Sequence, residues 1–83
     1  MVLLDNSYLT DIPDYIKSLD ISLLSLKKNF IKNINNLPES LIELNISDNK
    51  IYNINNISHL NNITYLNLSH NYITSIDYIP STV

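Results

Sequence analysis

The chain has 83 residues and a net charge of −3, and it contains no Cys, Gly, Trp, Ala, Arg or Gln. Without Cys there is no disulfide or thiolate metal site, and without Gly the phosphate-binding loops GxxxxGK and GxGxxG and the nucleophile elbow GxSxG are excluded. Five Lys and no Arg cannot supply the basic stripe that nucleic-acid backbones require, so we expect neither a cofactor nor a nucleic-acid partner.

We expect neither a signal peptide nor a membrane span. The start MVLLDNSYL lacks a basic segment followed by a sustained apolar stretch, and no segment approaches the roughly 20 apolar residues of a membrane span. We therefore expect an intracellular, cytoplasmic protein with no membrane partner. The abundance of Asn, Ile, Lys and Tyr favours an AT-rich source genome, such as that of a large DNA virus, a microbe or a protist. Asn is also expected to replace Gly wherever the backbone takes a positive φ.

Four segments share one hydrophobic pattern. They are VLLDNSYLTDI from Val2, ISLLSLKKNFIKNI from Ile21, LIELNISDNKIYNI from Leu41 and ITYLNLSHNYITSI from Ile63. Around each LxL, apolar residues alternate with polar ones, which predicts a strand with its apolar side chains toward the core. Further along, apolar residues recur at threes, which predicts a 3₁₀ turn. These pairs are Ile34 and Leu37, Ile54 and Ile57, and Ile76 and Ile79.

One polar position recurs in all four segments and sets the period. It holds Ser7, Asn29, Asn49 and Asn71. Alignment on this position predicts core columns in which equivalent residues stack, namely Leu9, Ile31, Ile51 and Ile73, and Ile12, Ile34, Ile54 and Ile76. If this position lies inside the fold, its amides need hydrogen-bond partners, because a buried amide without partners costs about 1–3 kcal/mol.

The repeated pattern LxxLxLxxNxI resembles the leucine-rich-repeat family. It is matched by Ile21, Leu24, Leu26, Asn29 and Ile31, and again in register from Leu41 and from Ile63. The resemblance implies an α/β solenoid of about 3.5–4 coils, with a parallel β-sheet on the concave face and 3₁₀ or extended turns on the convex face. It implies a single domain, 1–83, with repeats of about 1–18, 19–40, 41–59 and 60–83. It also implies that the recurring polar position, Ser7, Asn29, Asn49 and Asn71, is a structural ladder inside the stack, whose amides bond to open backbone groups where the chain leaves each strand. The repeats mix a 22-residue phosphatase-regulator-like type with a 20-residue bacterial-effector-like type.

Residues between the inward strand positions are not needed by the core, so they form the candidate binding face. The predicted partner-binding residues are Leu23, Lys27, Phe30, Glu43, Asn45, Tyr65, Asn67, His70 and Tyr72. We predict a non-catalytic adaptor or regulator that binds a protein partner through this concave face. For Tyr8, Phe30 and Tyr72 the alternative is that the rings only shield the edge of the core.

Catalytic and metal-binding roles are disfavoured. Asp48 and His70 are neighbours on adjacent predicted strands, but alternation sends Ser69 away from His70, and no Gly-built oxyanion pocket accompanies them. A metal site at His70, Asp48 and Asp5 lacks a second His, because His59 falls on the convex side. We predict no enzyme. The alternatives are a regulatory subunit for a phosphatase or ubiquitin ligase in another chain, which the resemblance alone implies, and a self-assembly module.

Neither end of the predicted stack carries a polar cap. Without a cap, the first and last coils expose the apolar side chains of the predicted core. We therefore expect a homodimer that joins like ends and continues the sheet. The predicted interface residues are Met1, Val2, Leu3, Leu4, Pro80 and Val83.

Overall fold

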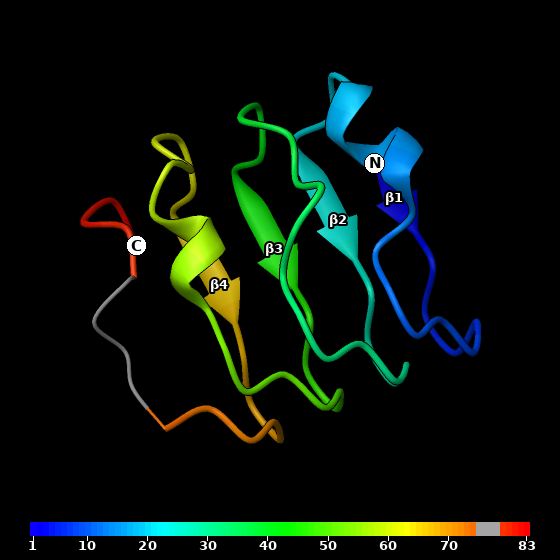
Figure 1. The fold of residues 1–83 in the computed structure, drawn as a ribbon. Coiled ribbons are helices and arrows are strands. Elements are labelled where there is room, and N and C mark those ends of the chain that lie inside the picture. The colour runs from blue at the N-terminus through cyan, green and yellow to red at the C-terminus, as the bar shows by residue number, and fades with distance from the viewer. Residues whose placement is uncertain (75–78) are drawn as a thin grey trace.

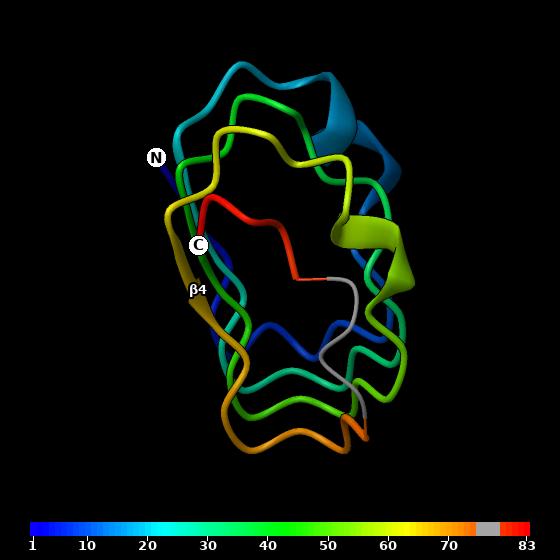
Figure 2. The ribbon, with the colours of Figure 1, turned by 90° about the vertical axis from the view of Figure 1, so that its left-hand side faces the viewer.

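The protein contains a four-stranded parallel sheet in which strands adjacent in sequence are adjacent in space. The computed structural model describes residues 1–74 and 79–83. The sheet order is β1-β2-β3-β4, with β1 at Val2–Leu3, β2 at Leu23–Ser25, β3 at Glu43–Asn45 and β4 at Tyr65–Asn67 (Figure 1). Each strand is followed by a segment that returns behind the sheet, and we call a strand with its return segment one turn of the chain. In Figure 2 the successive turns appear as nested loops. This arrangement agrees with the predicted α/β class.

The strand register follows the period of the recurring polar position. Val2 pairs with Leu24, Leu24 with Leu44, and Leu44 with Leu66. The strands have only two or three residues each, but the backbone ladder continues beyond them. The Lys28 N–H, for example, donates to the Ser47 carbonyl at 3.1 Å. Each turn is therefore held to its neighbour over a longer stretch than its strand.

The core fills the space between the sheet and the returning segments. Ile31 and Ile51 are 0% exposed, and Ile12, Ile34 and Ile54 are at most 2% exposed, as the column prediction requires. Ile76, expected in the same column, lies outside the described residues. The partly buried apolar residues lie toward the two ends of the chain, and they are Val2, Leu4, Leu9, Leu19, Ile21, Leu66, Leu68, Ile73 and Ile79. Inner turns are covered on both sides, whereas outer turns are covered on one side only.

Two of the returning segments contain a short 3₁₀ helix. The helix η1 (Asp14–Ser18) follows Pro13, whose carbonyl accepts the N–H of Ile16 at 3.1 Å, and Ile16 is fully buried. The helix η2 (Asn55–Ile57) lies where the spacing of Ile54 and Ile57 predicted it. These helices turn the chain on the side opposite the sheet (Figure 2).

The prediction of a 3₁₀ turn between Ile34 and Leu37 is wrong. No helix forms there, and Asn36 has a φ of 57°. Pro38 disfavours a helical conformation in the residue before it, which ends any such turn at Leu37. The Asn36 amide instead donates to the Ile12 carbonyl at 3.1 Å. The pair Ile76 and Ile79 includes a residue outside the described part of the chain.

Every described turn has a residue in the left-handed region just after its strand. These residues are Asn6, Lys28, Asp48 and His70, with φ of 53°, 58°, 57° and 56°. The expectation that Asn would take such positions is confirmed at Asn6 and Asn36. It is wrong at Lys28, Asp48 and His70, and also at Tyr8, which has a φ of 59°. Asp and His tolerate this region better than most residues, but Lys does not. In each turn the residue with positive φ immediately precedes the recurring polar position. The bend that it makes in the backbone therefore sets the direction of the next side chain, which is an Asn in three of the four turns.

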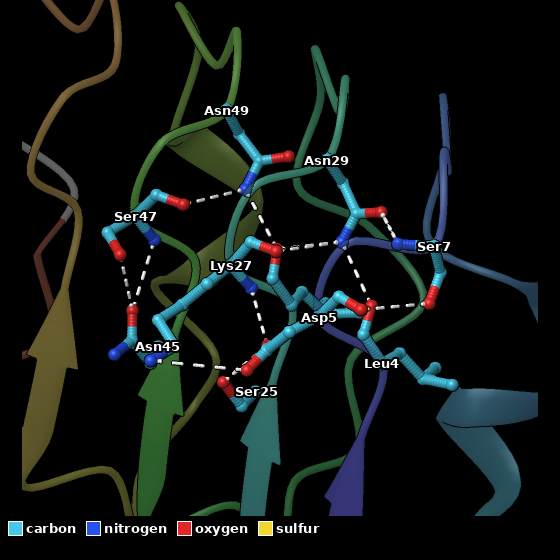
Figure 3. Close-up of polar contacts among 10 residues, drawn as sticks. Leu4, Asp5, Ser7, Ser25, Lys27, Asn29, Asn45, Ser47 and Asn49 are labelled. Atoms are coloured by element: carbon cyan, nitrogen blue, oxygen red, sulfur yellow. Dashed lines mark hydrogen bonds and ion pairs between the residues drawn. The ribbon is translucent and has the colours of Figure 1, made fainter.

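The amide of Asn49 joins its own turn to the preceding one. Its Nδ2 donates to the carbonyls of Leu26 at 2.9 Å and of Ile46 and Ser47 at 3.1 Å each. Its Oδ1 accepts the N–H of Ile31 at 3.0 Å. The side chain is 6% exposed, so one buried amide satisfies backbone groups of two turns (Figure 3).

Asn29 makes equivalent contacts with the first turn. Its Oδ1 accepts the N–H groups of Ser7 and Leu9, both at 3.0 Å, and its Nδ2 donates to the Leu4 carbonyl at 3.0 Å (Figure 3). Ser7 itself is exposed, and its hydroxyl donates to the Asp5 carbonyl at 3.2 Å. Ser7 therefore joins the ladder through its backbone, and the prediction of a ladder side chain at this position is not met.

Asn71 repeats the arrangement in the last described turn. Its Nδ2 donates to the carbonyls of Ile46 at 3.0 Å and Leu68 at 3.1 Å, and its Oδ1 accepts the Ile51 N–H at 3.0 Å. Asn71 is only partly buried. Each junction between described turns thus contains one Asn of the recurring polar position.

We expect Asn49→Leu to lower the free energy of unfolding by about 3 kcal/mol or more, because the buried Ile31 N–H and the carbonyls that Asn49 satisfies lose their partner. Asn35→Leu is the control, since Asn35 is exposed, and its effect should stay within about 0.5 kcal/mol. Urea denaturation followed by circular dichroism measures both. Equal midpoints for the two variants would remove the ladder as a source of stability.

We expect Lys28→Gly to raise the free energy of unfolding by about 1 kcal/mol, because Gly has no Cβ to oppose the positive φ at this position. Lys32→Gly removes a second exposed lysine at a position without positive φ, so it should destabilise the protein slightly. Thermal unfolding of the two variants gives the comparison, and a lower melting temperature for Lys28→Gly would contradict the strain argument.

Candidate functional site: the outer face of the sheet

The outer face of the sheet carries a hollow that spans all four strands. Strand alternation directs Leu24, Leu44 and Leu66 inward and their neighbours outward, so this face is built from every second strand residue. The hollow is lined by Met1, Leu3, Asp5, Leu23, Leu24, Ser25, Lys27, Glu43, Asn45 and Tyr65. The structure therefore brings together five of the predicted partner-binding residues, namely Leu23, Lys27, Glu43, Asn45 and Tyr65.

Apolar side chains give the hollow an exposed, water-facing surface. Met1 is 79% exposed, Leu3 61% and Tyr65 50%, and Leu23 lies half-buried between them. Met1 and Leu3 were expected at an oligomer interface, and the structure places them in the same hollow as Leu23 and Tyr65. Exposed apolar clusters of this kind commonly mark protein interfaces.

Asp5 organises the polar side of the hollow. Its Oδ1 accepts the Ser25 hydroxyl at 2.7 Å and the Lys27 N–H at 2.9 Å, while its Oδ2 lies 4.0 Å from the Lys27 Nζ (Figure 3). Ser25 was expected to face water, but it is only 7% exposed because it is covered by this network. The Asp5 carboxylate therefore holds β2 and the first turn together, and it partly neutralises the positive charge of Lys27.

Asn45 and Asn67, both predicted to bind a partner, use their side-chain oxygens within their own turns. The Asn45 Oδ1 accepts the Ser47 N–H at 3.1 Å and the Ser47 hydroxyl at 2.9 Å (Figure 3). Asn67 makes the same contacts with Ser69, at 3.0 and 2.7 Å. The Asn-x-Ser sequences at these two positions thus close a local turn at the end of the strand. Ser47 is 5% exposed.

Phe30, His70 and Tyr72 belong to another surface. They follow the strands and lie where the chain turns away from the sheet, and all three are exposed. The Phe30 ring stacks on Tyr8 with 6.4 Å between ring centroids and 20° between planes, and the Lys50 Nζ lies 5.5 Å from the Phe30 centroid. These predicted site residues therefore do not line the hollow.

The predicted interface residues at the ends differ in exposure. Val2 and Leu4 are half-buried against the core, and Val83 is 49% exposed. Pro80 is buried by its own chain.

The described part of the chain holds no group of three His, Asp or Glu side chains placed to bind a metal ion. Within residues 1–74 and 79–83, no helix has the length and apolar character needed to traverse a bilayer. No protein-family model matches the sequence, and no curated protein is significantly similar to it.

Proposed function

We propose that the chain is an intracellular leucine-rich-repeat module, a non-catalytic adaptor or regulator that holds a protein partner on the outer face of its sheet. The parallel strands, their register and the Asn amide at each junction agree with what the sequence pattern implies. The observation that carries the proposal is the hollow lined by exposed Met1, Leu3 and Tyr65. None of these side chains is needed by the core, so their exposure favours a role in recognition.

The charges around the hollow favour a partner that presents an apolar side chain beside a cation. Lys27 lies close to Asp5, whereas Glu43 is exposed and makes no ion pair within the described residues. A partner cation would therefore meet an unpaired carboxylate next to the apolar surface. Charge complementarity of this kind sets specificity and association rate.

We expect Tyr65→Ala to lower the recovery of a specific partner by about tenfold in an affinity capture from the source cells, as truncation of a central aromatic contact does. Tyr15→Ala is the matched control, because Tyr15 is 57% exposed, close to the 50% of Tyr65, but lies in η1. The captured protein is then purified and its affinity for each variant is measured by calorimetry. Equal affinity for the two variants, or no protein enriched over a blank matrix, would contradict the proposal.

Self-association is the second candidate function. Leu66, Leu68 and Ile73 in the last described strand and turn are half-buried, although their equivalents in the inner turns are fully buried. A second copy placed against this surface would complete the burial of these columns.

We expect light scattering at micromolar concentration to give twice the mass of one chain, and Leu68→Lys to restore the mass of a monomer, because a charge at this position opposes burial. Circular dichroism checks that the variant is folded. A monomer mass for the unaltered chain would exclude this candidate without affecting the capture experiment.

A further inference from the structure

Segments that follow the strands form a second outward surface, at the ends of the strand arrows in Figure 1. They stay in register because the N–H groups of Phe30, Lys50 and Tyr72 donate to carbonyls of the preceding turn at 2.7, 2.9 and 2.8 Å. Ile31 and Ile51 point inward and are fully buried, so the residues on either side of each face outward. We call the exposed set the lysine-aromatic edge, and it consists of Tyr8, Lys28, Phe30, Lys32, Lys50, Tyr52 and Tyr72.

The edge is positive although the chain is negative. It holds three of the five lysines, while the net charge of the chain is −3. Asp48 is the acid that lies among these lysines. The only ion pair in the described part of the chain joins Lys27 to Asp5, so the edge lysines have no acidic partner there. Their charge is therefore available to an external anion.

Aromatic rings lie between these lysines. Tyr8 is 83% exposed, Phe30 44%, Tyr52 56% and Tyr72 66%. A small hollow is lined by Asn6, Tyr8, Lys28 and Phe30. The rings supply apolar contact area at positions where nearby cations could bind carboxylates. Their exposure argues against the reading in which they only shield the core.

We propose that the lysine-aromatic edge binds an extended acidic peptide that carries an apolar side chain. Carboxylates of the peptide pair with Lys28, Lys32 and Lys50, and the apolar side chain packs into the hollow that Tyr8 and Phe30 help to line. Neighbouring strands lie about 4.8 Å apart and an extended peptide rises about 3.3 Å per residue, so a short motif crosses the four turns that carry the edge. This surface is separate from the hollow on the sheet, so the proposal does not depend on the proposed function.

The observations favour a peptide over a nucleic acid. Three lysines neutralise few phosphates, and a long polyanion would be repelled by Asp48 and by the net negative charge of the chain. A short peptide needs only local complementarity, and its apolar side chain uses the rings.

The test uses a fluorescein-labelled peptide in which Glu alternates with Leu and Phe, and fluorescence anisotropy at low salt. We expect Lys50→Glu to weaken binding about tenfold, because it reverses the charge beside Phe30. Lys17→Glu makes the same charge change in η1, away from the edge, and should alter affinity by less than about twofold. Phe30→Ser should weaken binding more than Tyr15→Ser, a matched change at an exposed ring in η1.

Several outcomes would overturn the proposal. Equal effects of Lys50→Glu and Lys17→Glu would show that the peptide senses only net charge. Tighter binding of a single-stranded oligouridine that competes with the peptide would assign the edge to nucleic acid. A dimer that Lys50→Glu dissociates in the absence of peptide would assign it to a second copy of the chain. Unchanged peptide affinity for Tyr65→Ala is expected, which separates this test from that of the sheet face.

Discussion

The structure depends on the hydrogen bonds of an Asn amide at each junction between described turns, buried at Asn29 and Asn49 and partly buried at Asn71. Strands of two or three residues are too short to define a sheet by themselves, and the chain has no disulfide to assist them. The Asn49 amide compensates by joining Leu26 and Ile31 of one turn to Ile46 and Ser47 of the next. An amide is suited to this role because it donates and accepts at once, so it can satisfy both N–H and carbonyl groups where the chain leaves the strand.

This hydrogen bonding requires the strained residue that precedes each Asn. A positive φ at Lys28, Asp48 and His70 redirects the chain so that the following amide points back into the stack. The strain of about 1–2 kcal/mol per residue is tolerated because the ladder and the core on either side fix the backbone. The positive-φ residue and the hydrogen-bonded Asn that follows it therefore occur together, once in each of these turns.

Because the core and the ladder use the inward positions, two outward surfaces are left without a structural role. On the sheet, exposed Leu3 and Tyr65 border a hollow with one unpaired acid, Glu43. On the lysine-aromatic edge, Lys50 and Phe30 present positive charge and ring surface together. The two surfaces have opposite charge and lie on successive parts of each turn, so they favour different partners.

The sequence by itself determined the period, the strand register and the buried columns, because equivalent positions in a stack must match in volume and polarity. Ile31 and Ile51 lie where spacing alone placed them, and the amides of Asn29 and Asn49 lie inside, as the resemblance implied. Only the tertiary structure decided which outward residues are accessible. Ser25 became buried because Asp5 reaches it from a neighbouring turn, and Asn45 turned its oxygen toward Ser47. Such contacts depend on side-chain reach between turns, which periodicity does not encode, whereas the burial of a column follows from the repeat itself.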